Sequence, residues 1–180
     1  FGMSDIPATA HAYLPSGLEW AGDSWYNNSS GQYDLPVRGN YAYHTFMHEI
    51  GHALGLKHPH ETDVFGAVEA GRDSIEFSVM SYRVHRGSDI NLEWGYNSVE
   101  DWGFAQTLMM HDIAALQHMY GANYDHNAGN TVYQWSPTTG EMFVDGSGQG
   151  APGDNRIFLT VWDGGGIDTY SFSNYTKPVT

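Results

Sequence analysis

Residues 48–58 read HEIGHALGLKH. His48 and His52 are four residues apart, so on a helix their imidazoles project from the same face, one turn apart. Apolar residues at three- and four-residue steps predict a helix over residues 43–54, and Gly55 supplies a left-handed stop after it. The sequence therefore predicts a helix that presents two metal ligands.

A third ligand can come from just beyond this helix. Gly55 lacks Cβ, so the chain can turn sharply there and bring His58 back toward the metal. Three neutral imidazoles would bind zinc and leave one position open for water. Glu49 points off the ligand axis, which suits it to act as a general base on that water. A bare H-E-x-x-H match occurs on ordinary helices, but the added Gly55 and His58 favour a zinc site.

Composition favours one well-packed domain over a disordered tail. The chain has 180 residues, of which 41% are hydrophobic and none is cysteine, so disulfides are excluded. Lys and Arg number 7 against 21 for Asp and Glu, a net charge of -14. This charge disfavours nucleic acid and anionic membranes as partners and suits calcium and positively charged groups. No apolar run is long enough to cross a bilayer, and no secretory signal is recognised.

Periodicity predicts an α+β fold with helices and sheet segregated. A second helix is expected within residues 104–121, with Gly121 as its cap. Between the helices, residues 59–78 predict a long ordered loop that ends in the tight turn SVMSY at 78–82. Alternating apolar segments predict short strands at 10–15, 24–28, 131–135, 141–145 and 156–162.

HEIGHALGLKH together with SVMSY resembles the metzincin clan of zinc proteases, and the residues around both resemble the serralysin family of secreted bacterial metalloproteases. The resemblance continues through YHTFMHEIGH, HDIAALQHMYGAN and TVWDGGGIDTYSFSNY. It implies a metzincin-type domain with a small twisted sheet, an active-site helix, a Met-turn and a second helix, followed by the first strands of a calcium-binding β-roll. The implied boundaries are 1–122 for the catalytic domain, with its N-terminal part missing, and 123–180 for the linker and start of the β-roll.

The resemblance also implies roles for two residues of SVMSY. Met80 matches the methionine that forms an apolar floor beneath the zinc. Tyr82 matches a tyrosine that can ligate zinc in the resting enzyme, so it is a possible further zinc ligand. A phenol there could also swing away and donate a hydrogen bond to the oxyanion, which makes Tyr82 a candidate catalytic residue. Without the zinc motif, ordinary core packing would explain both side chains.

A calcium site is implied by VWD and the glycines that follow it. In the family these residues start the β-roll, whose first ion is shared with a loop just after the second helix. Carboxylates and backbone carbonyls on tight glycine turns are the hard oxygen ligands that calcium requires. Because only a single repeat is present, a simple β-turn is the alternative interpretation. The implied calcium-binding positions are Asn127, Gly129, Thr131, Asp163, Gly165 and Asp168.

The predicted function is a secreted, extracellular zinc metalloendopeptidase that hydrolyses peptide bonds of proteins. Its expected cofactors are catalytic Zn²⁺ and structural Ca²⁺. Its expected partners are a protein or peptide substrate, and either its own N-terminal segment or a proteinaceous inhibitor. Two alternatives stay open: a zinc- and calcium-stabilised binding module without activity, and a zinc hydrolase acting on a non-peptide amide or ester.

Several other residues are not predicted to belong to the site. His44 lies one turn before His48, at the start of the helix, where a structural role is favoured. Trp20, Trp25 and Tyr26 could border a cleft, but their strand spacing favours a core. Five further histidines lack ligand spacing and are expected to be structural or solvent-facing; they are His60, His85, His111, His118 and His126.

Overall fold

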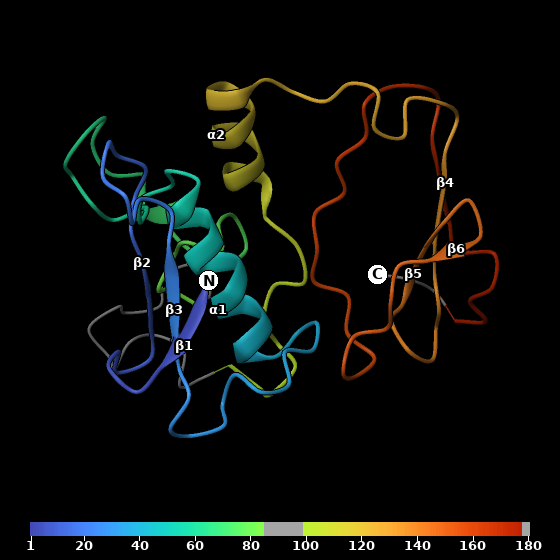
Figure 1. Cartoon of the computed structure of the whole chain (residues 1–180). Coiled ribbons are helices and arrows are strands. Elements are labelled where there is room, and N and C mark those ends of the chain that lie inside the picture. The colour runs from blue at the N-terminus through green and yellow to red at the C-terminus, as the bar shows by residue number, and fades with distance from the viewer. Residues whose placement is uncertain (85–98, 178–180) are drawn as a thin grey trace.

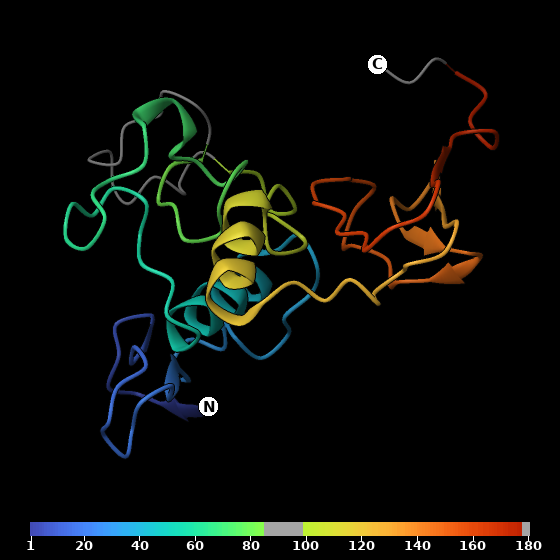
Figure 2. The same cartoon turned by 90° about the horizontal axis from the view of Figure 1, so that it is seen from above.

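The computed structural model describes residues 1–84 and 99–177 and has the predicted α+β character. Within this part of the chain, a three-stranded sheet and two α-helices form one portion, and a four-stranded sheet forms another. In both views the first sheet lies on one side of α1 (Tyr41–Ala53) and α2 (Met110–Tyr120) lies on the other (Figure 1, Figure 2). No described helix is both long and apolar enough to cross a membrane.

The first sheet has the order β1-β3-β2, with β3 (Ser24–Asn27) in the centre. β1 (Gly2–Ser4) pairs with β3 in parallel, and β2 (Ala10–Ala12) pairs with it in antiparallel fashion. Tyr26 of β3 is fully buried and stacks on Phe46 of α1, with 4.0 Å between ring centroids. This contact attaches one face of the sheet to the helix.

The helix α1 begins two residues earlier than the periodicity predicts. The side chain of Asn40 accepts a hydrogen bond from the backbone N–H of Tyr43, so Asn40 is the N-cap. At the other end, the Gly55 N–H donates to the carbonyl of His52, and Gly55 has a φ of +98°. The predicted glycine stop is therefore confirmed.

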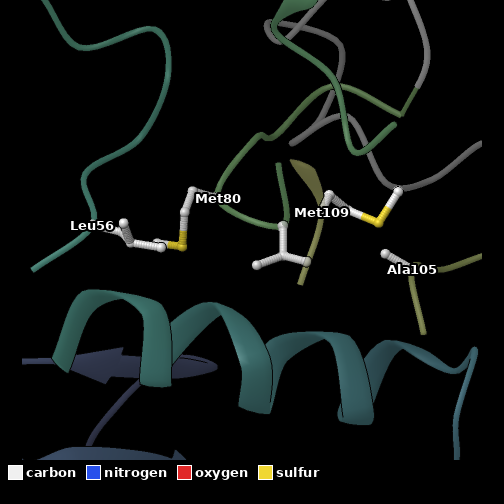
Figure 3. Packing of buried hydrophobic residues seen from close by; sticks show 5 residues of the cluster. Leu56, Met80, Ala105 and Met109 are labelled. Carbon is white, nitrogen blue, oxygen red and sulfur yellow. The ribbon is translucent and has the colours of Figure 1, made fainter. Parts of the chain in front are cut away.

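A small apolar cluster lies on the α2 side of α1 and contains the methionine of SVMSY. Figure 3 shows Leu56 and Met80 with their side chains close together above α1, and Ala105 and Met109 further along the helix. Met80 is only 1% exposed. The side chain of Met80 thus fills the space between α1 and the turn at residues 78–82. In the loop that precedes this turn, residues 59–78, only η1 (Ala70–Arg72) is helical.

The second helix is shorter than predicted. It begins only at Met110, because the Asp112 carboxylate accepts from the backbone N–H of Met109 and caps the helix there. Residues 104–109 are not helical but lie against the chain near Phe158, whose carbonyl accepts from the N–H of Gln106. Gly121 ends the helix at a φ of +87°, as expected.

The second sheet has the order β6-β5-β4-β7 and lies apart from α1 (Figure 1, orange and red). β4 (Val132–Trp135) and β5 (Met142–Val144) fall within predicted strands, whereas β6 (Ser147–Gly148) was not predicted. β7 (Thr169–Ser171) pairs in parallel with β4.

The strand predicted at residues 156–162 is wrong, because the backbone of this segment bonds to other partners. The carbonyl of Arg156 accepts from Gln106 Nε2, and the N–H of Thr160 donates to Thr107 Oγ1. These contacts hold the segment against residues 104–109 instead of in a sheet ladder.

The prediction of a core position is right for Tyr26 and wrong for Trp20. Trp20 is 49% exposed, because it lies in the turn between β2 and β3. Trp25 is half-buried on the sheet face opposite Tyr26, as the alternation of side chains along a strand requires. The prediction for His85 falls outside the described residues.

Replacing Gly51 by alanine tests the close packing of the methionine turn on α1. A Cβ at this position would lie 2.5 Å from Met80 Sδ and 3.4 Å from Leu56 Cδ1. Gly51→Ala is expected to lower the free energy of unfolding by about 1–3 kcal/mol, the usual cost of overpacking a core. Denaturant unfolding measures this, and Gly17→Ala is the matched control, since a Cβ there meets nothing within 4 Å. Equal stability of the two variants would contradict this account of the packing.

Candidate metal centre

Three histidine side chains converge at one end of the helix that the motif predicts. His58 Nε2 lies 3.2 Å from His48 Nε2 and 3.0 Å from His52 Nε2. Among the described residues these three form the group of potential ligands whose donor atoms all lie within 4.8 Å of one another. The structure therefore brings together the three residues predicted to bind zinc.

The second nitrogen of each ring determines what the converging atoms can do. His48 Nδ1 lies 2.8 Å from the carbonyl oxygen of Val79, and His52 Nδ1 lies 2.8 Å from that of Leu56. Because a carbonyl only accepts, both Nδ1 atoms carry hydrogen and both Nε2 atoms carry a lone pair. His58 Nδ1 lies 2.9 Å from Glu61 Oε1, which favours the same tautomer. Three lone pairs that face one another repel unless a cation lies among them, so the donor set fits a bound metal ion.

The turn after α1 places the third histidine. Gly55 adopts a positive φ, and the N–H of Leu56 then donates to the carbonyl of Gly51 at 2.9 Å. This reversal brings His58 back beside α1 and also aims the carbonyl of Leu56 at His52. One backbone turn thus supplies a ligand and orients another.

The helix α2 supports His48 through the peptide groups of the methionine turn. Asp112 is 2% exposed, and its Oδ2 accepts from the N–H groups of Val79 and Met109, each at 2.8 Å. Its Oδ1 accepts from Ser78 Oγ at 2.6 Å. Because the carbonyl of Val79 accepts from His48, the carboxylate holds the residue whose carbonyl orients this imidazole.

Glu49 and Tyr82 line the same cleft beside the histidines. The cleft has a volume of about 160 Å³, and its walls also include Thr9 and Ala10 at the start of β2. Glu49 is 6% exposed, and burial raises the pKa of its carboxyl group to about 7. The ring of Tyr82 lies 4.5 Å from that of His58 and 5.7 Å from that of His48, between centroids.

Burial keeps the three histidines neutral. It is the main cause that lowers the pKa of His48, and the neighbouring His52 lowers it further. Burial likewise lowers the pKa of His52 and of His58, although hydrogen bonds to Leu56 and to Glu61 oppose it. Neutral imidazole is the form that binds a metal ion.

A buried ion pair holds the residues on both sides of Tyr82. Asp73 is 2% exposed, its Oδ1 accepts from Ser81 Oγ at 2.6 Å, and its Oδ2 lies 3.2 Å from Arg83 Nε. The N–H of Ile75 donates to the carbonyl of Arg83. The chain around the tyrosine is therefore closed into a loop by both backbone and side-chain contacts.

The six predicted calcium positions lie on two segments that are in contact. Thr131 N donates to Asp168 Oδ1 at 2.9 Å, and Thr131 Oγ1 donates to the carbonyls of Asn127 and Gly129. Asp163 accepts from the Tyr133 hydroxyl and from the N–H of Gly165. These two hydrogen bonds lower the pKa of Asp163 and so favour the charged carboxylate.

Two residues that support the histidines are absent from the predicted site. Glu61 could have been found from its position three residues after His58, and Asp112 from its position at the start of a helix. The hydrogen bonds that Asp112 accepts from Ser78 and Val79 could not, because these residues are distant in sequence. His44 is buried in the cleft wall, and the ring of His60 stacks at 5.4 Å from that of His58. His111, His118 and His126 lie outside the three-histidine group.

The chain has an α+β fold with a group of three histidines that could hold a metal ion, and its relatives are metalloproteases by name. A family model described as the C-terminal region of M10 serralysin peptidases matches residues 122–179. The metallopeptidase AprA of Pseudomonas marginalis is 37% identical over 94% of this chain and 36% of its own length. Serralysin C of Dickeya chrysanthemi is 35% identical over 93% of this chain and 34% of its own length.

The serralysin of Photorhabdus laumondii is 32% identical over 98% of this chain and 37% of its own length. The chain belongs to the serralysin family. It spans about a third of the length of the curated relatives that it matches.

Replacing Asp112 by alanine tests whether this carboxylate holds the methionine turn. The variant leaves the buried Ser78 hydroxyl and two backbone N–H groups without their acceptor. Asp112→Ala is expected to lower the free energy of unfolding by about 2–4 kcal/mol, from lost hydrogen bonds and a lost helix cap. Denaturant unfolding measures the loss, with the exposed Asp5→Ala as the control. A loss no larger than in Asp5→Ala would rule out the supporting role.

Proposed function

We propose that this chain is the catalytic part of a secreted, extracellular zinc metalloendopeptidase that hydrolyses peptide bonds of proteins. The observation that carries the proposal is the convergence of three imidazole Nε2 atoms, one of them from His48, which lines a cleft together with Glu49. His48, His52 and His58 are the proposed zinc ligands. Membership of the serralysin family supports zinc, because the matched relatives are metalloproteases by name.

Glu49 is the proposed general base. Zinc bound by the three histidines would activate a water molecule and polarise the carbonyl of the peptide bond. Glu49 follows a ligand on α1 and lines the cleft, so its carboxylate can accept a proton from water held there. Its Oε2 is buried without a hydrogen-bond partner among the described residues. A raised pKa near 7 suits a group that takes up a proton and then passes it to the leaving amine.

Tyr82 is proposed to act at the zinc ion held by the three histidines. Its ring lies against those of His48 and His58, so its hydroxyl can serve as a further zinc ligand at rest. During the reaction the phenol would donate a hydrogen bond to the carbonyl oxygen as this gains negative charge. Burial raises the pKa of Tyr82 to about 12, which keeps the hydroxyl protonated and able to donate.

The proposed substrate is an extended protein or peptide segment. Ala10 of β2 lines the cleft, and β2 is at one end of the strand order β1-β3-β2, so a peptide could add beside it as a further strand. This arrangement favours a peptide over the amide or ester of a small molecule. A proteinaceous inhibitor or the protein's own N-terminal segment is a further proposed partner for the cleft.

The C-terminal portion is proposed to bind calcium. The proposed division is a catalytic, metzincin-type domain over 1–122 and a linker with the start of a β-roll over 123–180. The family model that matches residues 122–179 supports this boundary. The oxygen atoms of Asn127, Gly129, Thr131, Asp163, Gly165 and Asp168 are the proposed ligands, since the two segments that carry them are in contact.

Glu49→Gln tests the enzymatic proposal against a metal-binding module without activity. The variant keeps all three histidines but cannot accept the proton, so it is expected to retain about one zinc per chain and to lose at least about 100-fold in casein hydrolysis. Zinc analysis and hydrolysis are measured on the same preparation, with Glu69→Gln at an exposed position as control. Turnover comparable to Glu69→Gln would exclude Glu49 as the base. Zinc binding without turnover in the unchanged protein would favour the inactive module.

Calcium removal tests the proposal for the second portion. A calcium-selective chelator is expected to increase the proteolytic sensitivity and amide exchange of residues 123–168 before it disturbs α1, because the ligands join two separated segments. Asp168→Asn should reproduce the effect, while Asp125→Asn in the same portion should not. Exchange in residues 123–168 that is unchanged by the chelator would contradict the calcium site.

A further inference from the structure

A second pocket lies on the face of the first sheet that α1 does not cover. It has a volume of about 350 Å³. Ala10 and Tyr26 belong to the side of the sheet that meets the cleft and α1. Their neighbours His11 and Trp25 point to the opposite face, because side chains alternate along a strand. The lining residues are Ser4, Ile6, Pro7, His11, Tyr13, Trp20, Asp23 and Trp25.

Four of the eight lining residues of this pocket carry aromatic rings, and the backbone holds them in place. His11 and Trp25 are direct cross-strand partners, and the rings of His11 and Tyr13 meet edge to face at 5.3 Å between centroids. A Cβ on Gly2 would lie 2.6 Å from the indole of Trp25, so the glycine lets this ring lie over β1. Trp20 adds a ring that is 49% exposed.

The turn between β2 and β3 brings one carboxylate to these rings. The N–H of Tyr13 donates to the carbonyl of Asp23 at 2.9 Å, and the N–H of Asp23 donates to the carbonyl of Trp20 at 3.1 Å. The N–H of Gly22 donates to the carbonyl of Tyr13 at 3.0 Å. The turn is therefore closed, and it places Asp23 in the same pocket lining as the aromatic residues.

The negative charge of the residues around the pocket favours a cationic ligand. Residues 1–37 contain four acidic side chains and neither Lys nor Arg, and the whole chain has a net charge of -14. Aromatic faces attract cations, and a planar guanidinium can stack on a ring while it pairs with a carboxylate. The volume exceeds what a compact ammonium group would fill. The acidic, aromatic lining disfavours an anionic ligand.

We propose that this pocket binds the guanidinium group of an arginine side chain from another polypeptide. Trp20 and Trp25 stack on the guanidinium plane, and Asp23 pairs with it. The pocket opens away from the zinc-site face of the sheet, so the interaction does not require the proposed hydrolysis. It gives the protein a means to hold a basic polypeptide on a surface separate from the cleft.

A binding titration with matched peptides tests the proposal. The probe is acetyl-Gly-Arg-Gly amide, compared with the same peptide carrying citrulline, which keeps the shape of arginine but has no charge. Both are titrated into the protein with Glu49→Gln, so that no peptide is cleaved, and binding is followed by tryptophan fluorescence. The arginine peptide is expected to bind at least about tenfold more tightly than the citrulline peptide, a difference within the range of one desolvated cation–aromatic contact plus an ion pair.

Three variants decide whether the binding occurs in this pocket. Asp23→Asn and Trp20→Ala should each weaken binding of the arginine peptide about tenfold, with unchanged thermal unfolding. Glu19→Gln removes a charge from the same turn but not from the pocket lining, and binding should stay within about twofold. Equal binding of the two peptides, no binding of either, or equal losses in Glu19→Gln and Asp23→Asn would overturn the proposal.

Discussion

The hydrogen bond from His48 Nδ1 to the carbonyl of Val79 is the interaction on which the rest of the site depends. It fixes which ring nitrogen carries the lone pair and joins α1 to the turn that contains Met80. That turn is held in its own position by Asp112 at the start of α2. Val79 thereby connects two helices that are far apart in the sequence, and it links α2 through His48 to the proposed metal ion.

The motif HEIGHALGLKH predicted the convergence of the three histidines because its geometry is local. A four-residue spacing on a helix and a glycine turn are enough to place His48, His52 and His58 together. The partners of their second nitrogens come partly from the loop near residue 79, which is distant in sequence. No periodicity indicates that the carbonyl of Val79 meets His48, so this part required the structure.

The sequence predicted those parts of the fold that local patterns determine, such as strands with alternating side chains and helices that end at glycine. It missed those parts in which backbone groups bond to residues distant in sequence. Gly121 ends α2 as expected, but Asp112 moves the start of that helix to Met110. The apolar run at residues 156–162 has the composition of a strand, yet it bonds to residues 104–109. Trp20 is a large aromatic residue of the kind usually found in a core. It is exposed because the turn between β2 and β3 places it beside the face of the first sheet that α1 does not cover. Such outcomes depend on which segments meet, and a single sequence does not contain that information directly.

The two proposed metal sites differ in how their ligands are held. Around α1 the imidazoles are already oriented by hydrogen bonds, so a metal ion would complete a preformed arrangement. In the second portion, glycine backbones pack so closely that a Cβ on Gly166 would lie 2.1 Å from the carbonyl oxygen of Gly129. Carbonyls and carboxylates are gathered there on facing turns, which suits a hard cation that neutralises their combined charge.

X-ray absorption spectroscopy at the zinc edge, on protein loaded with one equivalent of zinc, tests the three-histidine centre most directly. The account predicts three imidazole nitrogens at about 2.0–2.1 Å, with oxygen in the remaining coordination. In His58→Ala the number of imidazoles should fall to two. A centre with fewer than three imidazoles in the unchanged protein, or a spectrum unaffected by His58→Ala, would contradict the account.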